Sequence, residues 1–186
     1  MFDTPITQDG NVISGPLRAP KQMLEEQSYD GSGAGSIHDD SMAEKLGFKA
    51  GPIEGPTHFS LFDPLLVKIW GKDWFEKGCF SSHFKNMVVE GEETKAFVEL
   101  PSDENQTRLR CWAEKADGTQ VLEASATLGG GKTLLEERLE NLRPLDHFII
   151  LEDMHVGMKG AVDEMATMGP DQHMGKLYPF SLKQKL

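Results

Sequence analysis

The chain has 186 residues, of which 38% are hydrophobic and 26% charged, a balance that predicts one folded domain with a core and excludes wholesale disorder. The net charge of -11 arises from 30 acidic against 19 basic residues, and no stretch concentrates Lys and Arg, so we expect neither a nucleic acid nor an anionic membrane as partner. No segment approaches the ~20 apolar residues that span a bilayer, and the N-terminus lacks the pattern of a signal peptide, so we expect a cytoplasmic location.

The first half of the chain alternates between glycine-rich or proline-rich passages and helical patterns. Residues 1–20 hold three prolines and two glycines and predict an extended N-terminal arm. Residues 21–29 allow a weak strand, and the glycine-rich loop that follows leads to His38. A short helix is expected over 41–46, capped by Asp39 or Asp40 and ended by a glycine.

Residues 57–70 form the most apolar helix candidate, with hydrophobic side chains at the three-and-four spacing of a helical face and on most of the remaining surface. Such a helix belongs in a core. Pro64 would break an ordinary helix interior, although Asp63-Pro64 is also a good cap and first-turn pair. Either a kinked helix or a two-part helix fits the sequence.

After this helix the hydrophobic pattern changes to the alternation typical of strands with one buried face, over 95–100, 108–114 and 121–128. Asp117-Gly118 indicates a hairpin between the last two, and 80–90 is a further candidate strand. The main domain is expected over 21–142, ending with a short charged helix at 134–142. Residues 143–186, which are rich in methionine, are expected to be an extension that packs on the body or on a partner.

Few chemical motifs appear in the chain. Cys79 and Cys111 lack Cys-x-x-Cys spacing and are interpreted as packing residues, which argues against a disulfide framework and a zinc knuckle. The sequence has no Gly-x-Ser-x-Gly elbow, phosphate loop or dinucleotide fingerprint, so no cofactor is expected. The side chains of His38, Asp39 and Asp40 are of types that can bind a metal ion. No other His lies at a helical ligand spacing from them, so no metal is expected.

Two histidines are candidates for a functional site. His38 carries an imidazole, follows a glycine-rich loop and precedes Asp39 and Asp40, which suits acid–base catalysis; the alternative is a surface histidine beside a helix cap. His58 stands at the start of the apolar helix. There the backbone amides around Gly55, Pro56 and Thr57 could bind a polarised carbonyl or an anion, an arrangement that is common in proteins.

The segment Ile-His-Asp-Asp-Ser-Met-Ala-Glu-Lys-Leu-Gly-Phe-Lys-Ala-Gly at 37–51, followed by Ile-Glu-Gly at 53–55, resembles the MaoC-like hydratase and dehydratase family. That resemblance implies an α+β hot-dog fold, in which an antiparallel sheet wraps around a long central helix, and a homodimer or higher oligomer of such subunits. It also implies reversible addition of water to a 2-enoyl thioester, with His38 in the catalytic pair and the amides near 55–57 polarising the thioester carbonyl.

The chain departs from the family at the second catalytic residue. Gly33 stands where the family has its Asp and Gly35 where it has an Asn, so a replacement carboxylate would have to act with His38. The candidates are Asp30, Asp39, Asp40 and Glu54, and the working hypothesis pairs His38 with Asp30 or Asp40. Asp39 is also assigned to substrate binding, together with the residues at 55–58.

Two alternatives stay open. The chain could be an inactive hot-dog subunit that binds an acyl ligand or pairs with an active homologue. It could also be a retuned enzyme of the same scaffold, a thioesterase, lyase or cyclase.

Overall fold

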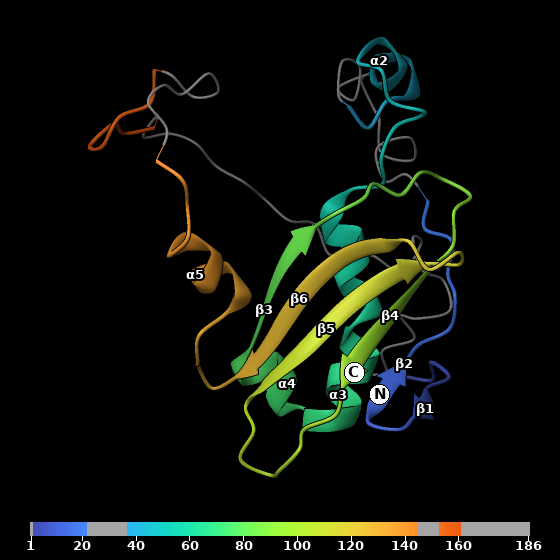
Figure 1. Cartoon of the computed structure of the whole chain (residues 1–186), viewed down its shortest axis with the longest axis vertical. Helices are drawn as coiled ribbons and strands as arrows, with labels where there is room; N and C mark the ends of the chain where they lie inside the picture. The colour runs from blue at the N-terminus through green and yellow to red at the C-terminus, as the bar shows by residue number, and fades with distance from the viewer. Residues whose placement is uncertain (1, 22–36, 145–152, 161–186) are drawn as a thin grey trace.

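The structure is a computed structural model that describes residues 2–21, 37–144 and 153–160 (Figure 1). A six-stranded sheet with entirely antiparallel pairing runs in the order β1-β2-β4-β5-β6-β3, and α3 and α4 lie behind it in Figure 1. The α+β class expected from the sequence is therefore present. The strands are Thr7–Asp9, Val12–Ser14, Gly78–Phe84, Thr94–Glu99, Arg108–Lys115 and Gln120–Leu128 for β1 to β6, and the α-helices are Asp40–Lys45, Asp63–Trp70, Asp73–Lys77 and Leu134–Leu139 for α2 to α5.

The segment expected to be an extended arm contains the hairpin β1-β2. Strand β2 pairs with β4, opposing Ile13 to Val98, and both side chains are buried in the core. The sequence did not predict these strands, because each has only three residues and the flanking prolines and glycines obscure the alternation. The predicted strand over 21–29 lies outside the described residues, apart from Lys21, which is not in a strand.

The predicted helix over 57–70 is divided into two parts, so the structure does not have a single long central helix. A 3-10 helix, Gly55–Leu61, is followed by α3, which begins at Asp63 with Pro64 in its first turn. Pro64 has no N–H to donate to the preceding turn, which favours a new helix start at this point. Of the two arrangements that the sequence allowed, the two-part helix is the one observed.

The strand predictions over β4, β5 and β6 are confirmed, with shifts of at most one residue at the ends. The expected hairpin turn is present: Gly118 has a φ of 85°, and Asp117 accepts a hydrogen bond from the Thr119 amide at 2.9 Å. Strand β3 ends at Phe84, well short of residue 90. The core contains side chains from one face of the strands packed on α3, including Leu65, Leu66, Val98, Leu109, Cys111, Leu122 and Ala126.

The two cysteines differ in environment. Cys111 is fully buried, as a packing residue should be, whereas Cys79 is exposed, so the expectation of packing is wrong for Cys79. Cys79 lies in β3 next to Phe80, which packs against the core, so the thiol belongs to the other face of the sheet.

In the described part of the chain, no helix is long and apolar enough to cross a membrane.

Candidate functional site

Asp39 has a capping role. Its carboxylate accepts a hydrogen bond from the Ser41 hydroxyl at 2.6 Å and from the Met42 amide at 3.0 Å, at the N-terminus of α2. These bonds lower the pKa of Asp39 below its ordinary value, the bond from Ser41 contributing most. The helix ends before Gly47, which has a φ of 87°, as the sequence predicted. Asp39 therefore stabilises the helix start, and its assignment to substrate binding stays a prediction.

Asp40 closes the segment that carries His38. Its carboxylate accepts a hydrogen bond from the Gly51 amide at 2.7 Å. Gly51 lies against the backbone of His38 so closely that a Cβ at this position would overlap the His38 carbonyl group. The carboxylate of Asp40 thus holds the two ends of the 38–51 segment together, which positions the backbone of His38.

The ring of His38 is held by the main chain of the body. Its Nδ1 lies 2.5 Å from the carbonyl oxygen of Pro52, and the side chain is half-buried. When Nδ1–H donates to this carbonyl, Nε2 carries the lone pair that can accept a proton. Pro52 pairs with Val89, and the Ile53 amide donates to the Val88 carbonyl at 2.7 Å, so the group that orients His38 is itself fixed.

A hollow of about 320 Å³ lies beside this anchor, between the start of the 3-10 helix and the residues that follow β3. Its walls are mainly apolar and include Pro52, to which His38 is bonded, and Ile37, its neighbour in the chain. The hollow is lined by Ile37, Pro52, Ile53, Gly55, His58, Phe84, Lys85, Asn86, Met87 and Val88.

His58 is the buried histidine of this hollow. The residue is 2% exposed, and burial lowers the pKa of the imidazole from its ordinary value to about 4, so the ring is neutral at pH 7. Its Nδ1 has no hydrogen-bond partner among the described residues, and the same holds for the hydroxyl oxygen of Thr57. The ring lies 6.3 Å from that of Phe84, measured between centroids.

The predicted cluster of backbone amides at 55–57 is smaller than expected. Pro56 has no N–H, and the Thr57 amide donates to the Glu54 carbonyl at 3.0 Å, which leaves the Gly55 amide as the remaining one of the three. Gly55 itself is required for packing, because a Cβ there would lie 2.8 Å from Cζ of Phe84. Phe84 therefore covers Gly55 and forms one wall of the hollow.

The site residues predicted from the sequence are thus only partly brought together. His38, Gly55 and His58 lie in or beside one hollow, whereas Asp39 and Asp40 make local hydrogen bonds within their own segment. Asp30 lies outside the described residues. Phe84, which sequence reasoning missed, had no signal beyond its place at the end of a candidate strand.

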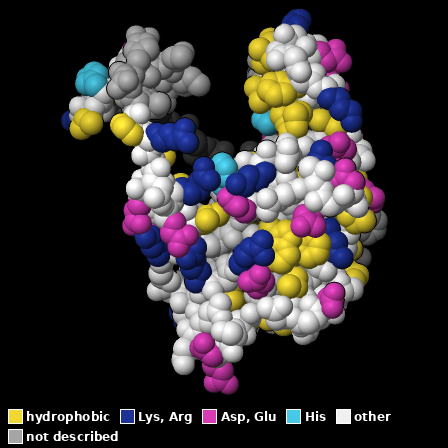
Figure 2. Space-filling model, viewed as in Figure 1, with side chains coloured by type: hydrophobic (Ala, Val, Ile, Leu, Met, Phe, Trp, Pro, Cys, Tyr) yellow, Lys and Arg dark blue, Asp and Glu magenta, His cyan; other side chains and the backbone are white. Residues whose placement is uncertain are grey.

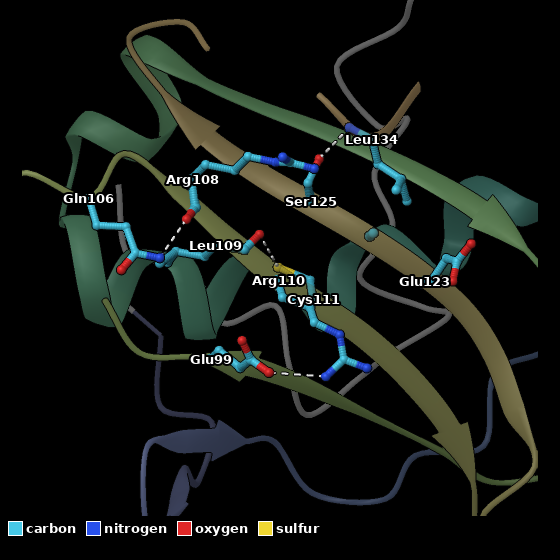
Figure 3. A pocket seen from close by; sticks show the side chains of 10 residues that line it. Glu99, Gln106, Arg108, Leu109, Arg110, Cys111, Glu123, Ser125 and Leu134 are labelled. Atoms are coloured by element: carbon cyan, nitrogen blue, oxygen red, sulfur yellow. Dashed lines mark hydrogen bonds and ion pairs between the residues drawn. The ribbon is translucent and has the colours of Figure 1, made fainter. Parts of the chain in front are cut away.

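A second hollow, of about 340 Å³, lies on the face of the sheet opposite to the core (Figure 3). Figure 2 shows acidic and basic side chains close together across this side of the molecule. Charged residues of the second hollow are paired: Arg108 forms two hydrogen bonds to Glu137, at 2.6 and 2.8 Å, and Arg110 bonds to Glu99 at 3.0 Å. A ligand there would compete with these ion pairs, so we favour the hollow beside His38 as the functional site.

In the residues that the structure describes, no group of three or more His, Cys, Asp or Glu side chains is arranged to hold a metal ion.

No protein-family model and no curated protein matches the chain. Among solved structures, it is similar to an (R)-hydratase from A. caviae involved in PHA biosynthesis, with 20% identity, a TM-score of 0.49, and coverage of 66% of this chain and 97% of that chain. It is also similar to the R-hydratase PhaJ1 from Pseudomonas aeruginosa, with 16% identity, a TM-score of 0.48, and coverage of 68% and 83%. The ChsH1-ChsH2 complex from Mycobacterium tuberculosis matches at 12% identity, with a TM-score of 0.37 and coverage of 64% and 88%. Similarity at this level does not assign the chain to a family.

Proposed function

We propose that the protein is a hot-dog enzyme of the MaoC-like hydratase and dehydratase type, which acts on an acyl thioester with His38 as general acid–base group. The observation that carries this proposal is the bond between His38 Nδ1 and the Pro52 carbonyl beside a mainly apolar hollow. A histidine whose tautomer is fixed in this way presents Nε2 as a base, and an apolar wall suits an acyl group. The sequence resemblance at 37–55 supplies the reaction class.

We further propose Asp30 as the carboxylate partner of His38, in preference to Asp40. Asp40 already accepts the hydrogen bond of the Gly51 amide, whose loss would release the segment that carries His38. Asp40 then acts as a positioning residue. Gly33, at the position of the family's catalytic Asp, has no side chain that could serve instead.

The test is an assay of crotonyl-CoA hydration, in which the rate is measured as the loss of the enoyl absorbance of this short 2-enoyl thioester. His38→Ala is expected to lower turnover by about 10²-fold or more, the scale of a lost acid–base group. Asp30→Asn should approach the same loss. The control His155→Ala removes an exposed imidazole in the segment 153–160 and should leave the rate unchanged. Folding of each variant is checked by circular dichroism, and an active, folded His38→Ala protein refutes the assignment.

A non-catalytic acyl-binding subunit is the second candidate function. It is favoured by the hydrogen bonds that Asp39 and Asp40 make within their own segment, which give both carboxylates a structural role. In that case purified protein binds crotonyl-CoA in a calorimeter without converting it, or converts it only after an active homologue is added. Measurement of released CoA thiol in the same samples detects a thioesterase.

We also propose that the chain forms a homodimer. Strand β3 ends the sheet on one side, and its outer edge pairs with no other strand of the described residues. The seven residues of β3 include neither Pro nor Lys, which commonly protect exposed edges. Light scattering coupled to size exclusion tests the mass, and a monomer at micromolar concentration contradicts the proposal.

A further inference from the structure

The hollow beside His38 has one feature that a simple hydrocarbon pocket would not have. Its wall is formed largely by Ile37, Ile53, Met87 and Val88, yet it also includes the imidazole of His58. A pocket built only for an alkyl chain gains nothing from a polar ring in its wall.

The hydrogen-bonding capacity of this ring is not met within the described residues. His58 is 2% exposed and its Nδ1 has no partner there, nor has the hydroxyl of the adjacent Thr57. A buried polar group without a partner destabilises the fold. A ligand that bonds to the ring would offset part of this cost, and a ligand without a polar atom would not.

The charges around the hollow decide which polar atom fits. Burial keeps His58 neutral at pH 7, so the ring does not provide a counter-charge for an anion. Lys85 also lines the hollow, but its ammonium group is paired with Glu123 at 2.7 Å. Asn86 donates its side-chain amide to the Gln120 carbonyl at 2.9 Å. These contacts favour a neutral oxygen over a carboxylate.

We infer that the hollow selects acyl groups that carry a neutral hydroxyl or carbonyl oxygen beyond the thioester, and that His58 is the residue that hydrogen-bonds to it. This inference rests on the proposed function, because it takes the hollow to hold the acyl part of a thioester substrate. His58 is then a specificity-determining residue.

Isothermal titration of the intact protein with three saturated thioesters tests the inference separately from turnover. The probes are butyryl-CoA, 4-hydroxybutyryl-CoA and succinyl-CoA, which have the same four-carbon acyl length and end in a methyl, a hydroxyl and a carboxylate. We expect 4-hydroxybutyryl-CoA to bind about tenfold more tightly than butyryl-CoA, the scale of one hydrogen bond, and succinyl-CoA to bind no better than butyryl-CoA.

Variants assign the preference to the ring. His58→Phe keeps an aromatic ring of similar shape and should bind both butyryl-CoA and 4-hydroxybutyryl-CoA with equal affinity. His58→Gln keeps a polar group and should retain part of the preference for 4-hydroxybutyryl-CoA over butyryl-CoA. This variant replaces His58→Phe in the test if the Phe variant does not fold. His83→Phe is the matched control, a histidine in β3 that does not line the hollow, and should behave as the wild type.

The outcomes separate the inference from the proposed function. Equal binding of all three thioesters by the wild type, or tighter binding of succinyl-CoA, overturns the inference and leaves acyl-thioester binding intact. A preference that survives in His58→Phe overturns the role of His58. Failure of all three thioesters to bind overturns the inference together with the proposed function.

Discussion

The imidazole of His58 is expected to make the folded protein less stable as the pH falls from 6.5 toward 4. Burial lowers the pKa of this group in the folded state from its ordinary value of 6.5 to about 4. Above pH 6.5 the ring is neutral in both the folded and the unfolded protein, so it has no effect on the pH dependence. Below pH 6.5 the unfolded chain binds a proton that the folded protein does not bind, and the free energy of unfolding decreases.

The size of the effect follows from the two pKa values. A tenfold difference in proton affinity corresponds to about 1.4 kcal/mol, so the full loss on passing below pH 4 is about 3 kcal/mol. About 2 kcal/mol of this is expected between pH 7 and pH 4.5. That is a large part of the 5–15 kcal/mol by which native proteins are commonly stable, so the loss should be readily measurable.

The assay is urea unfolding at pH 7, 6, 5 and 4.5, followed by tryptophan fluorescence. Other groups also titrate over this range, so the comparison is between the wild type and His58→Gln, which has no imidazole to protonate. The slope attributable to His58 is the difference between the two curves. The variant His155→Gln removes an exposed imidazole and should follow the wild type.

The reasoning is refuted if His58→Gln loses as much stability as the wild type between pH 7 and pH 4.5. Such a result would mean that the ring binds its proton in the folded protein as readily as in the unfolded chain. The neutral, buried state of His58 assumed for ligand selection would then be wrong as well.

Three further substitutions test the local structure by chemical denaturation. Gly51→Ala should destabilise the fold and lower turnover, because its Cβ would overlap the His38 carbonyl; an unchanged protein would contradict this packing. Asp39→Ala should destabilise the protein at pH 7 through loss of the α2 cap, and an equal loss at pH 2 would contradict a role for the carboxylate. Burial raises the pKa of Asp63, whose carboxylate accepts the indole N–H of Trp74 at 3.0 Å, so its ionised form is disfavoured in the fold. Asp63→Asn keeps an acceptor without the charge and should be neutral or stabilising at pH 7; a marked destabilisation would contradict this.

Features of the fold that depend on neighbouring residues could be predicted from the sequence. The start and end of α2 depend on Asp39 and Gly47, which act on amides within one turn, and both were among the predicted capping residues. The turn at Asp117 and Gly118 is equally local. The strands could be predicted because successive side chains point to opposite faces of a sheet, so a strand with one buried face alternates apolar and polar residues.

Features that depend on distant contacts could not be predicted in this way. The β1-β2 hairpin owes its place to pairing with β4, some 80 residues further along the chain. His58 is buried and its ring lies against that of Phe84, a residue distant in the sequence, so its lowered pKa has no local signal. For the same reason the sequence could not distinguish the exposed Cys79 from the buried Cys111.

The hydrogen bonds of the site suggest different tasks for the predicted polar residues. Asp40 was a candidate acid–base partner of His38, but its bond to the Gly51 amide makes it part of the support for the His38 backbone. His58 was a weaker candidate, and it is the residue with an unmet hydrogen bond in the wall of the hollow. The supporting carboxylate of Asp40, the oriented imidazole of His38 and the buried neutral imidazole of His58 are suited to three different tasks. We therefore expect Asp40→Asn to alter the stability of the 38–51 segment, His38→Ala to alter turnover, and His58→Phe to alter the choice of acyl group. Measured together, these three variants distinguish a site that holds, converts and selects a thioester from one that only binds it.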